Sequence, residues 1–256
     1  MNSRWRLIRI ALLAGPEAAV ATAVKNAFDA QKRAQDRLRT FVADASHELR
    51  TPLATLHGWI DLYVQGGLDS PERLDHAMER MQAEVGRMQL LVDELALLAH
   101  LDSARPLNRG VVDVVALAGE VVSDARVVDV DRAITLQGPT EAVVDGDGAR
   151  IQQVLRNLVG NAVQHTRPGT PVVVSVGVLA GEVVVEVADE GDGIAPEHLP
   201  HVFERFYRAD PSRSGSSSGL GLAIVEAIVA AHGGTVGVTS VPGQGTTVRV
   251  ALPAVK

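Results

Sequence analysis

Between about residue 32 and residue 104 the apolar residues recur at the three- and four-residue spacing of an α-helix, and no stretch alternates as a strand does. The segment QGGLDSPE interrupts the pattern, and in it Ser70 precedes Pro71 as an N-cap precedes a proline at the first helical position. The sequence therefore predicts a hairpin of two helices, about 32–65 and 71–103. The second helix carries an apolar row typical of a bundle seam: Leu74, Met78, Met81, Val85, Met88, Leu91, Val92 and Leu95.

A lone helical hairpin buries too little surface to be stable, so this one needs a partner. Two copies related by a twofold axis would form a four-helix bundle. We therefore expect a homodimer through the hairpin.

Beyond SARPLNRG the pattern changes to short valine-rich strands separated by helices. The expected strands are PVVVSVGVL, EVVVEVADE, TVGVTSV and TTVRVAL, and helices are expected near 148–165 and 218–232. This order predicts an α+β domain, one sheet covered by helices on one face. The chain thus divides into residues 1–31, which are Ala-rich and look like the end of an upstream segment, a helical domain 32–104 and a domain 105–256.

The net charge of −7 gives no general attraction to nucleic acid, and none is expected as a partner. The absence of cysteine excludes disulfides and thiolate metal sites. The most apolar stretch, IALLAGPEAAVATAV, is broken by Gly15-Pro16 and is too short for a membrane span. The expectation is a soluble, cytoplasmic protein as it stands.

The segment ADASHELRTPL places His47 on the predicted first helix, two residues from Ala45 and Leu49 on its apolar side, so the imidazole should face water. Thr51 follows one turn later on the same face. Glu48 is about 100° round the helix, near enough to bond the ring and take its proton. Pro52 should bend the helix just beyond. A solvent-facing imidazole beside a carboxylate is a usable nucleophile.

Four motifs in the second domain suggest a nucleotide site. Asn157, Asn161 and Gln164 share one face of a helix, and their amide oxygens suit a magnesium ion that bridges phosphates. Asp189 ends a strand, where its carboxylate could accept from the amine of adenine. Nearby glycines, Gly191 and Gly193, would let the backbone approach a flat ligand.

The third motif, VFERFYRAD, offers Arg205 and Arg208 to neutralise phosphate charge. The fourth, GSSSGLGL, opens a helix whose free N–H groups favour phosphate, with Gly219, Leu220 and Gly221 at its start. The Gly/Ser run SRSGSSSG before that helix is typical of a mobile loop.

ADASHELRTPL closely resembles the phosphoacceptor box of bacterial sensor histidine kinases. The four motifs, in this order, resemble the N, G1, F and G2 boxes of their ATP-binding domain, a Bergerat-type α/β sandwich. The resemblance covers about residues 38–254. It implies ATP and Mg²⁺ as cofactors, with His47 phosphorylated, Glu48 as acid/base partner and Thr51 orienting water for dephosphorylation of the partner. It also implies Asn161 as the magnesium ligand, Asn157 as a phosphate-side neighbour and Asp189 as the adenine anchor.

Many relatives have Lys-Tyr where this chain has Gln164-His165, so a phosphate-contacting cation is missing there. We expect Arg205 or Arg208 to compensate. The resemblance further implies that His47 passes its phosphoryl group to an aspartate of a response regulator, and that residues 1–31 are the tail of a signal-relay linker. The parent protein would then be anchored in the cell membrane.

Two alternatives stay open. ATPases of the same fold, such as the gyrase, Hsp90 and MutL group, use a glutamate four residues before the magnesium-binding asparagine, where this chain has Asn157. The second alternative is a dimeric scaffold, or half of a split kinase, that is phosphorylated in trans. Whether autophosphorylation runs in cis or in trans is also undecided, because the sequence does not give the handedness of the hairpin turn.

Overall fold

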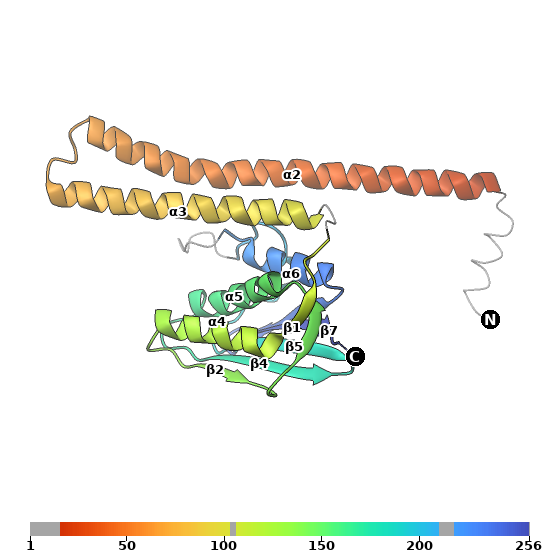
Figure 1. Ribbon diagram of the computed structural model, residues 1–256. Helices are drawn as coiled ribbons and strands as arrows, with labels where there is room; N and C mark the ends of the chain where they lie inside the picture. Colours follow the sequence, from red (N-terminus) through yellow and green to blue (C-terminus); the bar gives the residue numbers. More distant parts are fainter. Residues whose placement is uncertain (1–15, 103–105, 210–217, 256) are drawn as a thin grey trace. The chain divides into compact units, whose positions relative to one another are not determined.

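The computed structural model describes residues 16–102, 106–209 and 218–255 (Figure 1). The chain divides into two compact units. One contains the described residues up to His57, and the other begins at Gly58. Among the described helices, none has the length and apolar content that crossing a membrane requires.

Helix α2 runs from Pro16 to Val64. The prediction that this helix starts near residue 32 is wrong. It begins at Pro16, a residue type favoured at the first helical position, and the Ala-rich stretch that follows has high helix propensity. The helix also continues through Pro52 without a break, and Pro52 is buried. Residues 16–31 and the first arm of the hairpin therefore form one continuous helix.

Helix α3 extends from Pro71 to Asp102, close to the predicted range. Ser70 caps it as predicted, because its Oγ accepts a hydrogen bond from the Arg73 backbone N–H at 3.3 Å. The apolar row is only partly covered within one chain. Three residues at seven-residue spacing keep about half of their surface in solvent: Met78 (49%), Val85 (44%) and Val92 (51%).

The rest of the second unit is built on a five-stranded sheet of order β2-β4-β5-β7-β6. β2 is parallel to β4, and the other neighbours are antiparallel. The strands are β2 (Ile134–Gln137), β4 (Val172–Leu179), β5 (Glu182–Asp189), β6 (Thr235–Val241) and β7 (Gly245–Pro253). The four strands predicted from the valine-rich runs are confirmed within one or two residues, because their alternation at period two is strong.

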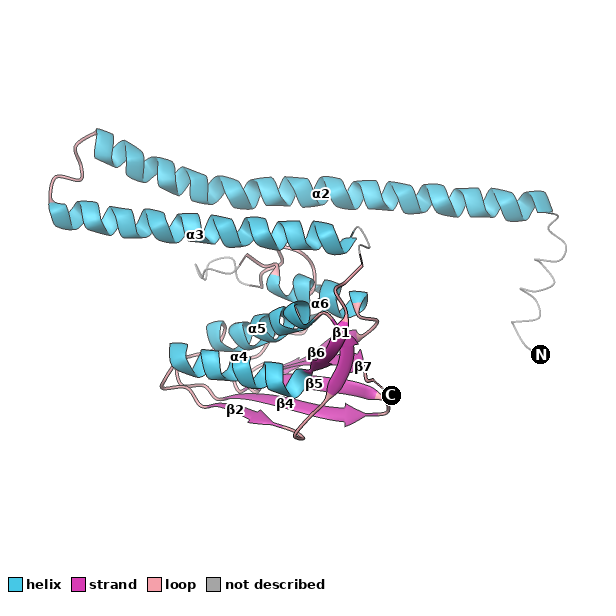
Figure 2. Cartoon of the chain, in the orientation of Figure 1, coloured by secondary structure: helices cyan, strands magenta, loops and turns pink. Residues whose placement is uncertain are grey.

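Three helices cover one face of this sheet, as Figure 2 shows: α4 (Val114–Val128), α5 (Gly148–Gln164) and α6 (Gly221–Ala231). α5 contacts both of the others. The core between the layers consists of fully buried aliphatic side chains, among them Leu155, Leu158, Ile224, Ile228, Val174 and Val187. The expectation of an α+β domain with helices on one face is confirmed.

The segment that leads into this domain was not predicted. β1 (Gly110–Asp113) pairs antiparallel with β3 (Val143–Gly146), and α4 and β2 lie between them in the chain. Asp113 holds the segment together. Its Oδ1 accepts from the backbone N–H of Val115 at 3.0 Å, which caps α4, and from that of Ala142 at 3.2 Å, which fixes the start of β3.

Candidate functional site

His47 lies on α2 with its side chain exposed, while Ala45 and Leu49 on either side are half-buried. The predicted orientation toward solvent is confirmed. Ser46 beside it bonds back to the helix, its Oγ donating to the Val42 carbonyl at 2.7 Å. Glu48 is half-buried, and no hydrogen bond joins its carboxylate to the His47 ring in the part of the chain that the structure describes. The role of Glu48 as proton acceptor stays a prediction.

Thr51 is exposed one turn after His47, as the helical spacing predicts. The next residue, Pro52, is buried instead. It continues the series Ala45, Leu49 and Leu56 at spacings of four and three, and it is the buried member of that series. The proline therefore belongs to the packed side of α2, and the threonine to the solvent side.

Asn157 and Asn161 are both half-buried on α5 and face the first residue of α6. The Asn157 side-chain amide donates to the carbonyl of Gly221 at 3.1 Å. A Cβ atom built on Gly221 would lie 3.7 Å from Asn161 Oδ1. The first and fourth motifs, more than fifty residues apart in the sequence, are therefore in direct contact.

Gln164 and His165 end α5, and both side chains are exposed. Gln164 is the last helical residue and His165 is the C-cap, its backbone N–H donating to the Asn161 carbonyl at 2.9 Å. The pair thus lies one turn beyond Asn161, at the end of the helix.

Asp189 ends β5 and organises the loop that follows. Its Oδ1 accepts from the backbone N–H of Gly191 at 2.9 Å and from that of Thr246 at 3.3 Å. No described residue donates to Oδ2. A Cβ on Gly191 would lie 2.6 Å from Cγ2 of Thr166, so a larger residue there would clash. The glycine is required by close packing at this point.

Gly193 has a positive φ of +69°, and a Cβ there would collide with the main-chain oxygen of Val241. The loop is fixed to the β6–β7 turn by two hydrogen bonds: the Ile194 N–H donates to Ser240 Oγ at 2.8 Å, and the Gly243 N–H donates to the Asp192 carbonyl at 2.8 Å. The second motif is consequently a rigid loop, held by a turn that sequence reasoning did not connect with it.

Gly219 also has a positive φ, +70°, and a Cβ there would come within 2.8 Å of the Phe206 backbone. The Phe206 N–H donates to the Gly219 carbonyl at 2.9 Å, which joins the third motif to the fourth. The side chain of Leu220 is fully buried and belongs to the core, and its predicted part in cofactor binding stays a prediction. Of the Gly/Ser loop predicted to be mobile, 212–219, residues 212–217 lie outside the described residues.

The two arginines of the third motif are half-buried. Arg205 forms an ion pair with Asp102, the last residue of α3, in which Nη2 lies 2.8 and 2.9 Å from the two carboxylate oxygens. The predicted compensation for the missing lysine by Arg205 or Arg208 stays a prediction. The partner of Arg205 could not have been foreseen, because the two residues are 103 positions apart.

Glu94, also on α3, accepts a hydrogen bond from Ser218 Oγ at 2.7 Å. Burial raises the pKa of the Glu94 carboxyl, and the Ser218 hydrogen bond partly opposes that rise. The sequence offered no signal for this residue beyond its place on a helix.

These contacts join the four motifs into one region of the second unit. Asn157 and Asn161 meet Gly221, Phe206 meets Gly219, and Thr166 after α5 meets Gly191. Within the described residues, no group of three histidine or carboxylate side chains is arranged to hold a metal ion. What the region offers is an acidic side chain, two amides and a helix N-terminus around glycine-lined backbone, which is suited to a nucleotide.

Two family models match the chain. Residues 37–104 match the His Kinase A (phospho-acceptor) domain, and residues 146–256 match the histidine kinase-, DNA gyrase B- and HSP90-like ATPase family. The first match falls inside the predicted helical domain 32–104, and the second falls inside the predicted domain 105–256.

The probable sensor histidine kinase TcrY of Mycobacterium tuberculosis (strain ATCC 25618 / H37Rv) is 49% identical over 89% of this chain and 48% of its own length. The chain therefore spans about half the length of this curated relative. The structure of the mycobacterial sensor histidine kinase MprB is 30% identical, with a TM-score of 0.52 over 57% of this chain and 97% of that one.

The histidine kinase ThkA, solved in complex with the response regulator protein TrrA, shares the fold. Its TM-score is 0.69 at 23% identity, over 89% of this chain and 66% of that one. The matched phosphoacceptor and ATPase families, the identity to TcrY and the coverage of MprB agree on one conclusion. The chain belongs to the sensor histidine kinase family.

Proposed function

We propose that this chain is an ATP-dependent protein-histidine kinase, which phosphorylates its own His47 and passes the phosphoryl group to an aspartate of a response regulator. The observation that carries the proposal is the pairing of two features in one chain. The His47 imidazole is exposed in the phosphoacceptor segment. The four motifs of the second domain lie together in one region, which includes Asn157, Asn161 and Gly221.

In this proposal Asp189 anchors the adenine. Its Oδ1 is occupied by two backbone N–H groups, which fix the carboxylate, and Oδ2 is the oxygen that would accept from the exocyclic amine. The phosphates would lie toward the start of α6, because the first turn of a helix leaves N–H groups without intrahelical acceptors. The close approach of Gly221 to Asn157 and Asn161 places both amides beside the start of that helix.

Asn161 fits the role of magnesium ligand. Its amide oxygen is a hard donor, and Mg²⁺ is commonly held by one or two protein oxygens together with substrate phosphates. Bound there, Mg²⁺ would neutralise charge on the phosphates of ATP. Arg208 or Arg205 would add positive charge on the same side, in place of the lysine that many relatives carry.

In the reaction, a ring nitrogen of His47 attacks the γ-phosphorus in line. The N–P bond forms as the bond from the γ-phosphorus to the bridging β–γ oxygen breaks, and ADP leaves. Glu48 takes the proton from the other ring nitrogen, which leaves His47 as a phosphoramidate with an uncharged imidazole ring and an anionic phosphoryl group. Asn157 replaces the water-activating glutamate of related ATPases with an amide that has no useful basicity, so hydrolysis should be slow.

The partners follow from the same proposal. Met78, Val85 and Val92 form a row at heptad spacing on α3 that one chain leaves half exposed, as expected where a second hairpin completes a four-helix bundle. A receiver domain of a response regulator would then accept the phosphoryl group, and the ThkA–TrrA complex is a precedent for such a pair. Thr51, exposed one turn after His47, would orient water for dephosphorylation of that receiver.

The domain division 1–31, 32–104 and 105–256 belongs to the proposal as well. Residues 1–31 would be the end of a signal-relay linker, and the parent protein would be anchored in the cell membrane with this part in the cytoplasm.

The test is autophosphorylation with γ-labelled ATP and Mg²⁺, wild type beside His47→Gln, with His57→Gln as a control on the same helix. The label should be acid-labile and alkali-stable, as phosphohistidine is, and only His47→Gln should abolish it. Binding of ATP by the wild type without any label would favour the scaffold or split kinase instead.

A further inference from the structure

We propose that Arg132 is a positioning residue for the nucleotide site, acting through Thr166 on the backbone at Gly191. The inference rests on the proposed function, since it concerns the adenine side of the same site. Arg132 lies between α4 and β2, and no sequence motif includes it.

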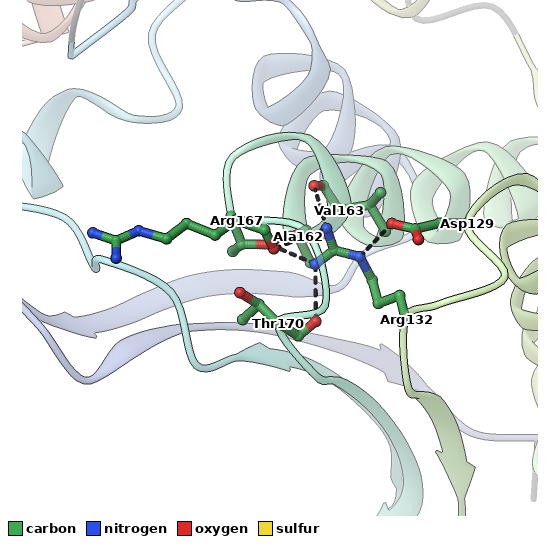
Figure 3. A network of polar contacts seen from close by, with 7 residues as sticks. Asp129, Arg132, Ala162, Val163, Arg167 and Thr170 are labelled. Atoms are coloured by element: carbon green, nitrogen blue, oxygen red, sulfur yellow. Dashed lines mark hydrogen bonds and ion pairs between the residues drawn. The ribbon is translucent and has the colours of Figure 1, made fainter.

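The Arg132 side chain is almost completely buried, with 2% of its surface in solvent. A guanidinium has five N–H donors, and each of these has an acceptor here (Figure 3). The acceptors are Asp129 Oδ2 (2.7 Å), Thr166 Oγ1 (2.7 Å) and the main-chain oxygens of Thr170 (2.8 Å), Arg167 (3.1 Å) and Val163 (3.3 Å). Such a set fixes the position of the arginine and of every group that it contacts.

Four of these five acceptors belong to the end of α5 and the turn that leads to β4. Val163 is in the last turn of α5, where carbonyl groups lack intrahelical partners. A cation at that end also interacts favourably with the helix dipole. Arg132 therefore determines how the chain leaves the helix that carries Asn157 and Asn161.

Thr166 links the position of Arg132 to the second motif. Its hydroxyl accepts from Arg132 and donates to the Ala162 carbonyl at 2.6 Å, so the side chain is held in one rotamer. In that rotamer Cγ2 lies against Gly191, at 2.6 Å from where a Cβ would be. The Gly191 N–H in turn donates to Asp189 Oδ1 at 2.9 Å. The series Arg132, Thr166, Gly191, Asp189 connects a buried arginine to the adenine anchor.

The test uses two variants of Thr166, because removal of Arg132 would leave several buried acceptors unpaired and could unfold the domain. Thr166→Val keeps the methyl group that packs on Gly191 and replaces the hydroxyl that Arg132 holds with a second methyl group. Thr166→Ser keeps the hydroxyl and loses the methyl that packs on Gly191. The control is Arg126→Gln. It removes a 2.7 Å hydrogen bond from Nε of Arg126, on α4, to the carbonyl of Ile134, on β2. Neither residue belongs to the series from Arg132 to Asp189.

Binding of Mg-ADP, adenosine and tripolyphosphate to the full chain is measured by calorimetry, well below the unfolding temperature of each variant. Both Thr166 variants should bind adenosine and ADP about three- to tenfold more weakly, the equivalent of one hydrogen bond or less. Affinity for tripolyphosphate should be unchanged, a pattern that a loss of stability alone does not produce. The Arg132→Lys protein, whose side chain has fewer N–H donors, should also bind adenosine and ADP more weakly than wild type.

Wild-type affinities for adenosine in both folded Thr166 variants would overturn the inference while leaving the proposed function standing. A wild type that binds neither ADP nor adenosine would overturn the proposed function, and this inference with it.

Discussion

The side-chain amide of Asn157 donates a hydrogen bond to the main-chain oxygen of Gly221, 64 residues later in the chain, over 3.1 Å. This bond joins the helix that carries both asparagines to the first residue of α6. The N-terminus of α6 is thereby fixed against the amides, and the two features of the site that suit phosphate and magnesium face the same region.

Replacement of Asn157 should therefore affect the site more than the fold. Asn157→Asp loses the N–H donor and places a carboxylate against a carbonyl, so we expect stability to fall by about 1 kcal/mol and ATP affinity to fall at least tenfold. Urea unfolding and calorimetric titration with ATP measure the two. The control is Gln152→Ala, an amide on the same helix whose 2.9 Å bond to Glu120 is exposed. Equal effects of the two variants on ATP affinity would contradict the assignment.

Gly219 and Gly221 should respond differently to alanine. Gly219 has a φ of +70° and no room beside the Phe206 backbone, so Gly219→Ala should cost about 1–3 kcal/mol of folding free energy. At Gly221 the added methyl group meets Asn161 at 3.7 Å, an ordinary contact, and thermal unfolding should change little. Nucleotide binding should be weakened in both. A Gly221→Ala protein that binds ATP normally would show that this surface does not face the phosphates.

The half-buried Glu94 makes stability depend on pH. Its pKa in the folded chain is raised above the ordinary value of 4.5, so above that pH the folded state retains a proton that the unfolded state releases. Stability should therefore fall as pH rises from about 4.5 through the folded-state pKa. Glu94→Gln still accepts from Ser218 and should be more stable than wild type at pH 7, but not at pH 4. Urea unfolding against pH measures this, with the exposed Glu79→Gln as control; parallel pH profiles for wild type and Glu94→Gln would contradict it.

The Asp102–Arg205 ion pair should contribute little to stability, although Nη2 of Arg205 contacts both carboxylate oxygens. The Asp102 side chain is 54% exposed and that of Arg205 31%, so solvent screens the pair. A double-mutant cycle with Asp102→Asn and Arg205→Gln should give a coupling below about 1 kcal/mol that shrinks at high salt. If Arg205 also neutralises phosphate, Arg205→Gln alone should slow autophosphorylation. A slowing of similar size in Asp102→Asn would assign the effect to the ion pair instead.

The sequence predicted the strongly patterned elements well. The four valine-rich strands, α3 and α5 were found nearly to the residue, because alternation and capping residues mark their ends. The β1–α4–β2–β3 segment was missed. Its strands have four residues each, too short for a period to show, and the valine-rich α4 looks like a strand by composition. The Asp113 N-cap and the buried positions Val114, Ala118, Val121 and Val122 were the available signals.

The candidate site was predicted as motifs, and the contacts between them were not. Asn161, Asp189 and Gly221 carry their chemistry in their residue types, which a sequence displays directly. Arg132 and Glu94 matter through partners more than thirty residues away, and only the fold brings those together. The side chain of Leu220 is fully buried in the core, which its place in the fourth motif did not predict.

The central claim is that His47 receives the phosphoryl group. Trypsin should release residues 40–50 as the peptide TFVADASHELR, in which His47 is the single histidine. After incubation with ATP and Mg²⁺ and digestion at alkaline pH, mass spectrometry should find one phosphoryl group on this peptide, with fragment ions locating it on the imidazole. The Asn161→Ala and Asp189→Asn proteins should yield the unmodified peptide. A phosphoryl group on Thr40, on Ser46 or on another peptide, or wild-type labelling in Asn161→Ala, would contradict the account.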